Sequence, residues 1–393
     1  MQGRKKQVKL KLVDWLERDN EESFFSHWLV KMLNQKYDIV YANEPDFIIF
    51  NANACGYEHQ KYDCVRIGYT VENIRIDYNI ADYGINGDFM VFEDRHLRIP
   101  LFGGISKDWG ECYNFKSRNI NNDNKRKFCS YMVSHSGASL RDSLGGFRDR
   151  FFDILSKYKQ VDSGGMWRNN IGETIDNHWS DDWRTNKHKW LQNYKFNLCF
   201  ENSSYPGYLT EKLFDAYNAG CVPIYWGDTS LRVGFADNAG GGGFDISDTE
   251  CIDMRVPEIP LHLIEYKINP KAFINAHNFP NLNALLEEVK RIDNDDKAYE
   301  AMRNEPLFLN NFNPNEFYEK KIFEFFDYIF SQGADLAFRR GEGRHLKFYR
   351  DRNDKFIDYE NLSKDALSVA TSYNDIYNSI RKFCRVLKFW KKS

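Results

Sequence analysis

The chain has 393 residues, of which 42% are hydrophobic and 28% are charged, the ordinary composition of a folded globular protein. Its formal net charge of -3 gives no global attraction for nucleic acid, so an anionic ligand must be bound locally. The length exceeds what one hydrophobic core usually supports, which predicts two domains.

The eight cysteines form no C-x-x-C pair, which argues against zinc sites and thioredoxin-like chemistry and favours a reducing compartment. No run of about eighteen apolar residues, the minimum for a membrane span, is present. We therefore expect a cytoplasmic protein.

The first third of the chain alternates strand-like and helical patterns, as a parallel α/β sheet does. Strands are predicted at 8–15, 37–42, 45–50 and 64–73, and a helix at 21–35. The last strand, CVRIGYTVEN, ends in a polar tip that includes Glu72. Ligands of open α/β sheets bind at such carboxyl ends.

A polar, asparagine-rich run at 116–127 is predicted to be a linker, after which the α/β pattern resumes. A strand is expected at 127–135 and a turn at 163–169, and helices are expected at 145–158, 281–292 and 315–330. Two successive α/β domains with a cleft between them follow from this pattern.

One segment, FNLCFENSSYPGYLTEKLFDAYNAGCVPIYWG, combines a strand, a polar loop, a helix and a second strand. Thr210 is placed as the N-cap of the helix, where its oxygen would accept a backbone N–H, and Gly220 follows its end. The loop therefore lies at the carboxyl end of a strand and at the amino end of a helix.

This position favours an anion such as phosphate, and Lys212 adds a full positive charge. Glu211 suits sugar hydroxyls, and Tyr208 offers a ring edge and a phenol. A sugar nucleotide explains this mixture of residue types. The alternative is an ordinary helix start, in which Glu211 complements the helix dipole and Lys212 is solvated.

These residues resemble the α-1,3-fucosyltransferases of glycosyltransferase family 10, of the bacterial type. The family's donor motif reads F-x-L-x-F-E-N, then Y-x-T-E-K, a helix and V-P-[IV]-Y-W-G, and here it is matched by FNLCFEN, YLTEK and VPIYWG. Weaker similarity extends from roughly Tyr62 to Tyr328.

The resemblance implies an α/β fold with two Rossmann-like domains facing across a cleft, the GT-B type. We place an acceptor-side domain at 1–122, a GDP-fucose-binding domain at 126–335 and a C-terminal tail at 336–393. The resemblance also implies an inverting enzyme that moves L-fucose from GDP-fucose to the 3-hydroxyl of GlcNAc in an N-acetyllactosamine-type glycan. The product would be of the Lewis x type.

The family's catalytic base is a glutamate in a [YT]-x-E-N strand tip, which YTVEN supplies as Glu72. A plain surface carboxylate is the alternative for this residue. The family also uses an arginine on the first helix of the donor domain to neutralise the diphosphate. The resemblance places this arginine at Arg148, and Arg150 is the alternative if the alignment shifts by two residues. The donor-binding residues implied in this way are Arg148, Asn202, Tyr208, Glu211 and Lys212.

Neither acidic cluster, Asp181 with Asp182 or the DNDD segment from Asp293 to Asp296, is a D-x-D at a strand end beside the donor motif. We expect no metal site and no required cofactor, with Mn2+ or Mg2+ at most stimulating. Two departures from the family are His135, where many members have asparagine, and the glycine run from Gly240 to Gly243, predicted to be a flexible loop.

Two rival functions remain open: a GT-B glycosyltransferase with a different nucleotide-sugar donor, and a non-catalytic carbohydrate-binding protein.

The chain end, NSIRKFCRVLKFWKKS, has an apolar helical stripe and many basic residues. It suits either peripheral contact with the inner face of the membrane or docking onto the body of the protein.

Overall fold

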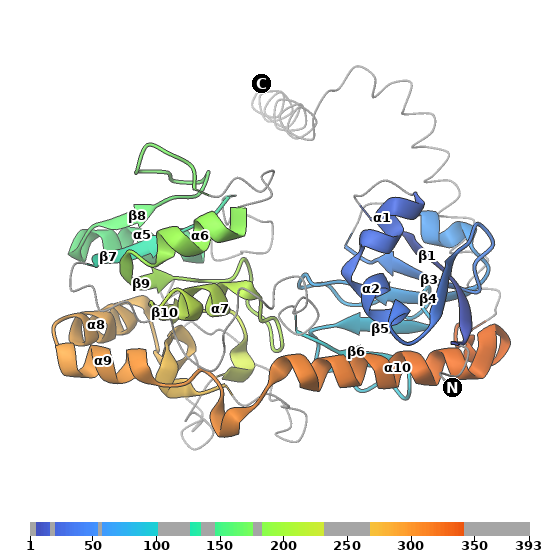
Figure 1. The fold of residues 1–393 in the computed structure, drawn as a ribbon. Coiled ribbons are helices and arrows are strands. Elements are labelled where there is room, and N and C mark those ends of the chain that lie inside the picture. Colours follow the sequence, from blue (N-terminus) through green and yellow to red (C-terminus); the bar gives the residue numbers. More distant parts are fainter. Residues whose placement is uncertain are drawn as a thin grey trace, which may run out of the picture.

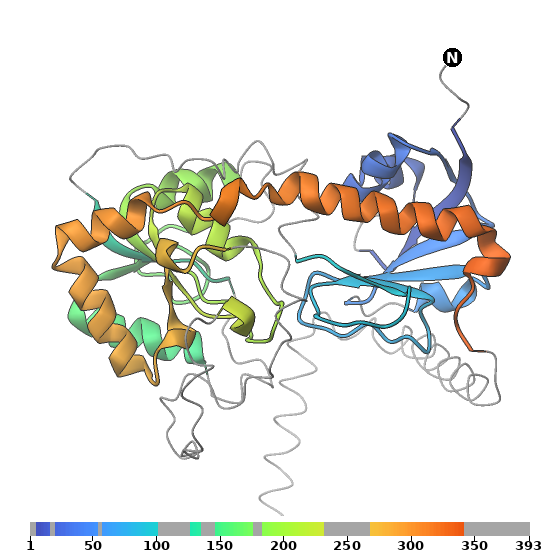
Figure 2. The same cartoon turned by 90° about the horizontal axis from the view of Figure 1, so that it is seen from below.

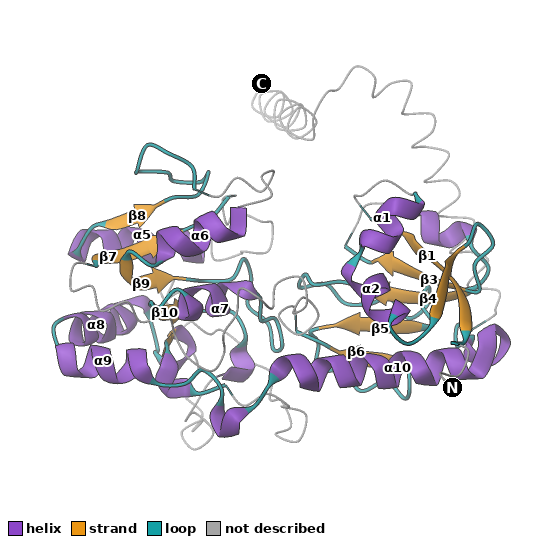
Figure 3. Ribbon diagram, in the orientation of Figure 1, coloured by secondary structure: helices purple, strands orange, loops and turns teal. Residues whose placement is uncertain are grey.

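A computed structural model describes residues 5–15, 20–53, 57–100, 126–134, 146–175, 183–231 and 268–341 of the chain (Figure 1). These residues form two α/β units, each built around its own parallel sheet (Figure 3). The strand–helix alternation expected from the sequence is thereby confirmed.

The first unit contains a six-stranded sheet in the order β2-β1-β3-β4-β5-β6, with every neighbouring pair parallel. Its elements are β1 (Gln7–Val13), α1 (Glu21–Ser26), α2 (Trp28–Asn34), β2 (Asp38–Tyr41), β3 (Phe47–Asn51), β4 (Val65–Tyr69), β5 (Tyr83–Asn86) and β6 (His96–Arg98). The central strands β3, β4 and β5 are almost completely buried, which explains their continuous apolar sequences.

The single helix predicted at 21–35 is two helices, and His27 separates them. His27 has an extended backbone (ψ 132°), and its Nδ1 accepts a hydrogen bond from the Leu29 N–H at 3.3 Å. The imidazole thus caps α2, a role that helical periodicity does not reveal.

The second unit contains a five-stranded sheet in the order β11-β10-β9-β7-β8, also with parallel pairs. Its elements are β7 (Lys127–Tyr131), α5 (Phe147–Tyr158), β8 (Val161–Ser163), α6 (Trp183–Leu191), β9 (Tyr194–Leu198), α7 (Glu211–Asn218), β10 (Val222–Tyr225), β11 (Ile274–Asn275), α8 (Leu282–Asp293) and α9 (Asp296–Asn304). Phe147, Phe151 and Leu155 of α5 are buried in the core of this unit, and Ile154 is partly buried beside them.

The last helix, α10 (Pro314–Ala337), extends from the second unit along the first (Figure 2). At its start, the Phe312 and Phe317 rings lie 5.2 Å apart. Near its end, Phe330 packs on Tyr37 and Phe47 of the first unit, with ring centroids 5.1 and 4.8 Å apart. Phe325 also packs on Tyr83 of β5, with ring centroids 5.8 Å apart, so the later turns of α10, within the range assigned to the donor domain, pack on the first unit.

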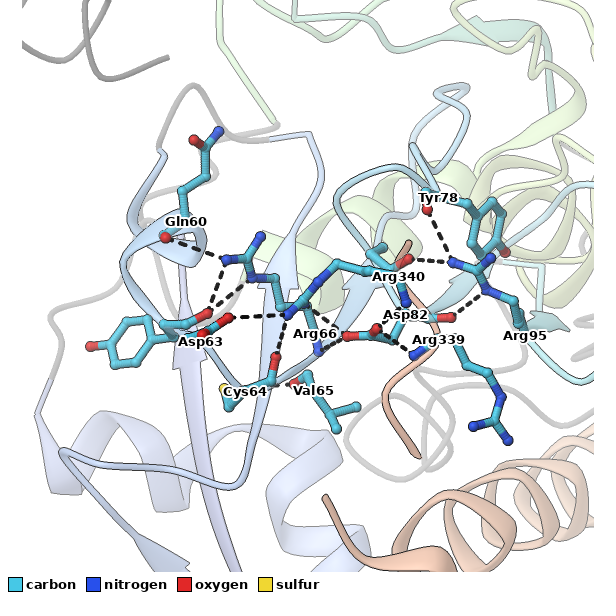
Figure 4. Close-up of polar contacts among 12 residues, drawn as sticks. Gln60, Asp63, Cys64, Val65, Arg66, Tyr78, Asp82, Arg95, Arg339 and Arg340 are labelled. Atoms are coloured by element: carbon cyan, nitrogen blue, oxygen red, sulfur yellow. Dashed lines mark hydrogen bonds and ion pairs between the residues drawn. The ribbon is translucent and has the colours of Figure 1, made fainter. Parts of the chain in front are cut away.

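Buried Asp82 anchors the chain that follows α10 (Figure 4). Its Oδ1 accepts the backbone N–H groups of Arg339 and Arg340 at 2.8 and 2.7 Å. Its Oδ2 accepts the Arg340 guanidinium at 2.8 Å and the Arg66 N–H at 2.7 Å. This network attaches the carboxyl end of α10 to the first unit.

Among the described residues, no helix is both long and apolar enough to cross a bilayer. Several predicted features lie outside the residues that the structure describes: His135, the pair Asp181 and Asp182, the glycine run 240–243, the linker 116–125 and the tail from 342 onward.

Candidate active site

The strand order of the second sheet reverses between β7 and β9. Read from β8, it is the doubly wound order 2-1-3-4-5, in which ligands bind outside the carboxyl ends of the strands at the reversal point. The helices that follow these two strands are α5 and α7. Arg148 lies in the first turn of α5 and Lys212 in the first turn of α7, and the positive charge of Arg148 acts on Lys212.

Glu201 organises the amino end of α7 from a fully buried position. Its Oε1 accepts the Thr210 N–H at 2.8 Å, and its Oε2 accepts the Thr210 hydroxyl at 2.6 Å. Lys212 Nζ forms an ion pair with the same Oε2 at 3.0 Å. Thr210 is the N-cap residue as predicted, but the predicted side-chain cap bond is wrong. The Thr210 hydroxyl oxygen accepts from Lys212 Nζ at 3.0 Å instead of from a backbone N–H of the first turn.

Lys212 keeps 24% of its side chain exposed, and its ammonium group contacts the Thr210 hydroxyl at 3.0 Å and Glu211 Oε1 at 3.4 Å besides Glu201. Burial alone would lower the pKa of Lys212, but the carboxylates of Glu201 and Glu211 raise it above its usual range. Burial likewise favours a higher pKa for Glu211, yet Lys212 and Lys187 lower this pKa to about 2. Both side chains are therefore charged at neutral pH.

Helix α7 ends as predicted, because Gly220 adopts φ 78° beyond its last turn. The Gly220 N–H donates to the Tyr217 carbonyl at 2.9 Å and the Cys221 N–H to the Ala216 carbonyl at 3.0 Å, the two bonds of a Schellman motif. These bonds fix the carboxyl end of α7, directly before β10.

Glu72 of the first unit reaches the loop between β9 and α7. Its Oε2 accepts the Tyr208 phenol at 3.0 Å and the Asn202 amide at 3.3 Å. Burial and the carboxylates of Glu201 and Glu72 raise the pKa of Tyr208, so the phenol keeps its proton and acts as the donor. No hydrogen bond from the described residues reaches Oε1 of Glu72, which leaves that oxygen as an open proton acceptor.

The six residues predicted for the site thus fall into one region of the described structure. Glu72, Asn202 and Tyr208 are in direct contact, Glu211 and Lys212 follow in the first turn of α7, and the charge of Arg148 acts on Lys212. Their roles in binding and catalysis remain predictions.

Sequence reasoning missed Lys187 and its partner. Lys187 lies on α6, which no sequence pattern predicted, and its Nζ forms an ion pair with Asp215 of α7 at 2.7 Å.

Asp293, one of the acidic residues considered as a metal ligand, instead pairs with Lys195 at 3.0 Å and also binds Lys159. Within the described part of the chain, no group of three or more His, Cys, Asp or Glu side chains could hold a metal ion.

Two family models match the chain. Residues 10–104 match the α-(1,3)-fucosyltransferase FucT N-terminal domain, and residues 122–236 match the C-terminal part of glycosyltransferase family 10 (fucosyltransferase). Together they span more than half of the sequence. The chain belongs to glycosyltransferase family 10.

Curated relatives of this family 10 fucosyltransferase include α-(1,3)-fucosyltransferase FucT of Helicobacter pylori, 27% identical over 399 residues, covering 90% of this chain and 71% of that protein. α-(1,3)-Fucosyltransferase B of Drosophila melanogaster is 24% identical over 208 residues, covering 51% of this chain and 39% of that protein.

Solved structures similar to this fucosyltransferase include an α1,3-fucosyltransferase with GDP-fucose (26% identity, TM-score 0.59, 84% of this chain and 92% of that one). Another is an α1,3-fucosyltransferase with GDP (25% identity, TM-score 0.62, 87% and 95%). The two Rossmann-like domains are therefore those of the GT-B fold, and the predicted fold class is confirmed.

Proposed function

We propose that this family 10 enzyme transfers L-fucose from GDP-fucose to the 3-hydroxyl of GlcNAc in an N-acetyllactosamine-type glycan, with inversion at the anomeric carbon. One observation carries the proposal: Glu72 of the first domain lies within hydrogen-bond distance of Asn202 and Tyr208 of the second. A base and a donor-binding loop supplied by different domains suit a two-substrate transfer.

In this mechanism Oε1 of Glu72 takes the proton of the acceptor hydroxyl. The hydroxyl oxygen forms a bond to C1 of fucose while the bond from C1 to the diphosphate oxygen breaks, and GDP leaves. Because Tyr208 and Asn202 both bind Oε2, they orient the carboxylate and leave Oε1 for the proton.

The departing diphosphate gains negative charge, which Lys212, Arg148 and the amino end of α7 can stabilise. Glu211 is charged and suits the hydroxyls of a ribose. With two cationic side chains at hand, we propose that no metal is required and that Mn2+ or Mg2+ at most stimulates transfer. Activity that survives EDTA would agree, whereas activity abolished by EDTA and restored by manganese would contradict this.

The decisive experiment incubates the full chain with GDP-fucose and a panel of GlcNAc-containing acceptors and assigns the new linkage by NMR. We expect an α-1,3 bond to GlcNAc, a Lewis x-type product, and calorimetry should detect GDP binding but little UDP binding. Tight UDP binding without GDP binding would favour another nucleotide-sugar donor. Glycan binding without nucleotide binding would favour the non-catalytic alternative.

We also propose that the enzyme is cytoplasmic and that its basic C-terminal segment contacts the inner face of the membrane. The test is removal of residues 378–393 followed by co-sedimentation with anionic liposomes. Loss of binding supports the proposal, and unchanged binding contradicts it.

A further inference from the structure

Beside Glu72, a second set of polar side chains joins the two domains. Asn73 follows Glu72 in the first domain, and Ser203 follows Asn202 in the second. The Asn73 amide donates to the Ser203 hydroxyl at 2.9 Å, and that hydroxyl donates to Asn202 Oδ1 at 3.0 Å. Asn202 in turn donates to Glu72 at 3.3 Å.

Arg75 fixes the donor-to-acceptor direction of this series of hydrogen bonds. An arginine side chain only donates, so Asn73 must turn its Oδ1 towards Arg75 Nη2, 2.6 Å away, and its amide nitrogen towards Ser203. Ser203 then accepts from Asn73 and has its own proton for Asn202 Oδ1. The amide nitrogen of Asn202 is left facing Glu72, so each of these four hydrogen bonds joins a donor to an acceptor.

Arg75 is itself held from both domains. Its Nε lies 2.6 Å from Oδ2 of buried Asp88, and its guanidinium carbon lies 3.9 Å above the ring of Tyr205. Asp88 also accepts the Asn86 amide at 2.8 Å, at the end of β5. The stacking on Tyr205 is a second contact between the domains, independent of Ser203.

We propose that Arg75, Asn73 and Ser203 are positioning residues that orient Asn202 and, through it, the base Glu72 against the donor. We name Arg75, Asn73, Ser203, Asn202 and Glu72 the interdomain hydrogen-bond chain. The proposal rests on the proposed function, because it assumes that Glu72 acts on a substrate. It adds three residues that act on the reaction through their neighbours.

Breaking the chain should affect the chemical step more than nucleotide binding. Lys212 and Arg148, the cations proposed for the diphosphate, lie within the second domain and do not belong to the chain. A small displacement of Glu72 removes the alignment with the acceptor hydroxyl, and misalignment of about 1 Å can cost a large factor in rate.

The test compares Ser203→Ala with Ser204→Ala in the full-length protein. Ser204 is a matched control, because its hydroxyl donates to the Gly227 carbonyl at 2.8 Å within the second domain. Ser203→Thr keeps the hydroxyl, and Asn73→Asp removes the donor that faces Ser203. We expect Ser203→Ala and Asn73→Asp to lower kcat about tenfold, with the GDP Kd changed by less than about twofold.

Ser204→Ala and Ser203→Thr should keep kcat close to wild type. Equal kcat for Ser203→Ala and Ser204→Ala in an active enzyme would overturn the proposal. Failure of the wild type to transfer fucose would instead count against the proposed function.

Amide hydrogen exchange tests the chain independently of activity. In peptides covering 69–76 and 199–209, Ser203→Ala should exchange faster than wild type, and Ser204→Ala should show no change over 69–76. Unchanged exchange on both sides in Ser203→Ala would contradict the hydrogen-bond chain even if no acceptor were used.

Discussion

The phenol of Tyr208 donates a 3.0 Å hydrogen bond to Oε2 of Glu72, across the boundary between the two domains. Tyr208 is adjacent to Gly207 and lies two residues before the N-cap of α7, so the donor loop and the proposed base are in contact. A movement that separates the two domains at this point would break the bond, which couples domain arrangement to the position of Glu72.

Lys212→Ala should have two separable effects. Loss of the ammonium group should weaken GDP binding about tenfold or more. It should also destabilise the fold by about 3–5 kcal/mol, because fully buried Glu201 loses its cationic partner at 3.0 Å. Calorimetry with GDP and urea unfolding measure the two effects.

The double variant Lys212→Ala with Glu201→Gln separates the loss of GDP affinity from the loss of stability. Removing the unpaired charge should recover much of the lost stability while GDP affinity stays low. Full recovery of GDP affinity in the double variant, or unaltered affinity in Lys212→Ala, would refute the phosphate role of Lys212.

Gly207→Ala should disturb the contact between the domains. Gly207 has φ +88°, and a Cβ there would lie 2.1 Å from the Gly87 carbonyl oxygen. Gly172 is a matched control, because it has φ +81° with nothing within 4 Å of its Cβ position. Both substitutions add backbone strain of about 1–2 kcal/mol, but only Gly207→Ala adds the clash.

We therefore expect Gly207→Ala to lose most transfer activity and Gly172→Ala to keep it, when both are assayed at saturating GDP-fucose. Similar activities for the two variants would show that the approach of Gly87 and Gly207 does not matter for catalysis.

His96 should make stability depend on pH. Burial lowers its pKa to about 4, below the usual 6.5. As the pH falls below 6.5, His96 becomes protonated in the unfolded chain but stays neutral in the folded protein until about pH 4. The free energy of unfolding therefore falls across this window. The loss should reach about 3 kcal/mol.

His96→Gln tests this assignment, because glutamine can still accept from the Tyr78 phenol and donate to the Asp88 carbonyl, the two partners of His96. Urea unfolding at pH 7 and pH 4.5 should show a smaller stability loss in the variant, by about 2–3 kcal/mol. Equal losses in wild type and variant would exclude His96 as the source.

Asp82→Asn should loosen the attachment of α10 to the first domain. The substitution leaves the buried Arg340 guanidinium without its carboxylate at 2.8 Å, which should cost about 3–5 kcal/mol in thermal or urea unfolding. Asp63, whose side chain is 82% exposed at 4.0 Å from Arg340, is the control. Asp63→Asn should leave stability unchanged within error, and an equal effect of both variants would contradict the role of Asp82.

The local parts of the structure could be predicted from sequence because their causes are local. Apolar runs predicted strands β1 to β4, β7, β9 and β10, and Thr210 marked the start of α7. Glu72 follows β4 at the carboxyl edge of its sheet, although β4 ends at Tyr69 and not at the predicted residue 73. These features depend on neighbouring residues and on the general behaviour of parallel sheets.

The remaining features depend on contacts between distant residues. Nothing in the sequence pairs Asn73 with Ser203 or Gly87 with Gly207, and the helix break at His27 requires an imidazole to cap the next turn. Thr210 was assigned the correct position but the wrong bond, because its hydroxyl donates to buried Glu201 and its oxygen accepts from Lys212 instead of from a backbone N–H. Contacts between side chains of different domains leave no periodic pattern in the sequence from which they could be predicted.

The proposed transfer depends most on Glu72 as the base, and Glu72→Gln tests this role directly. In a transfer assay with GDP-fucose and an N-acetyllactosamine acceptor, kcat should fall by about 10²–10⁴-fold, because the amide cannot take the acceptor proton. GDP affinity and the unfolding midpoint should stay close to wild type. Near-normal turnover by folded Glu72→Gln would contradict the assignment of Glu72 as the base.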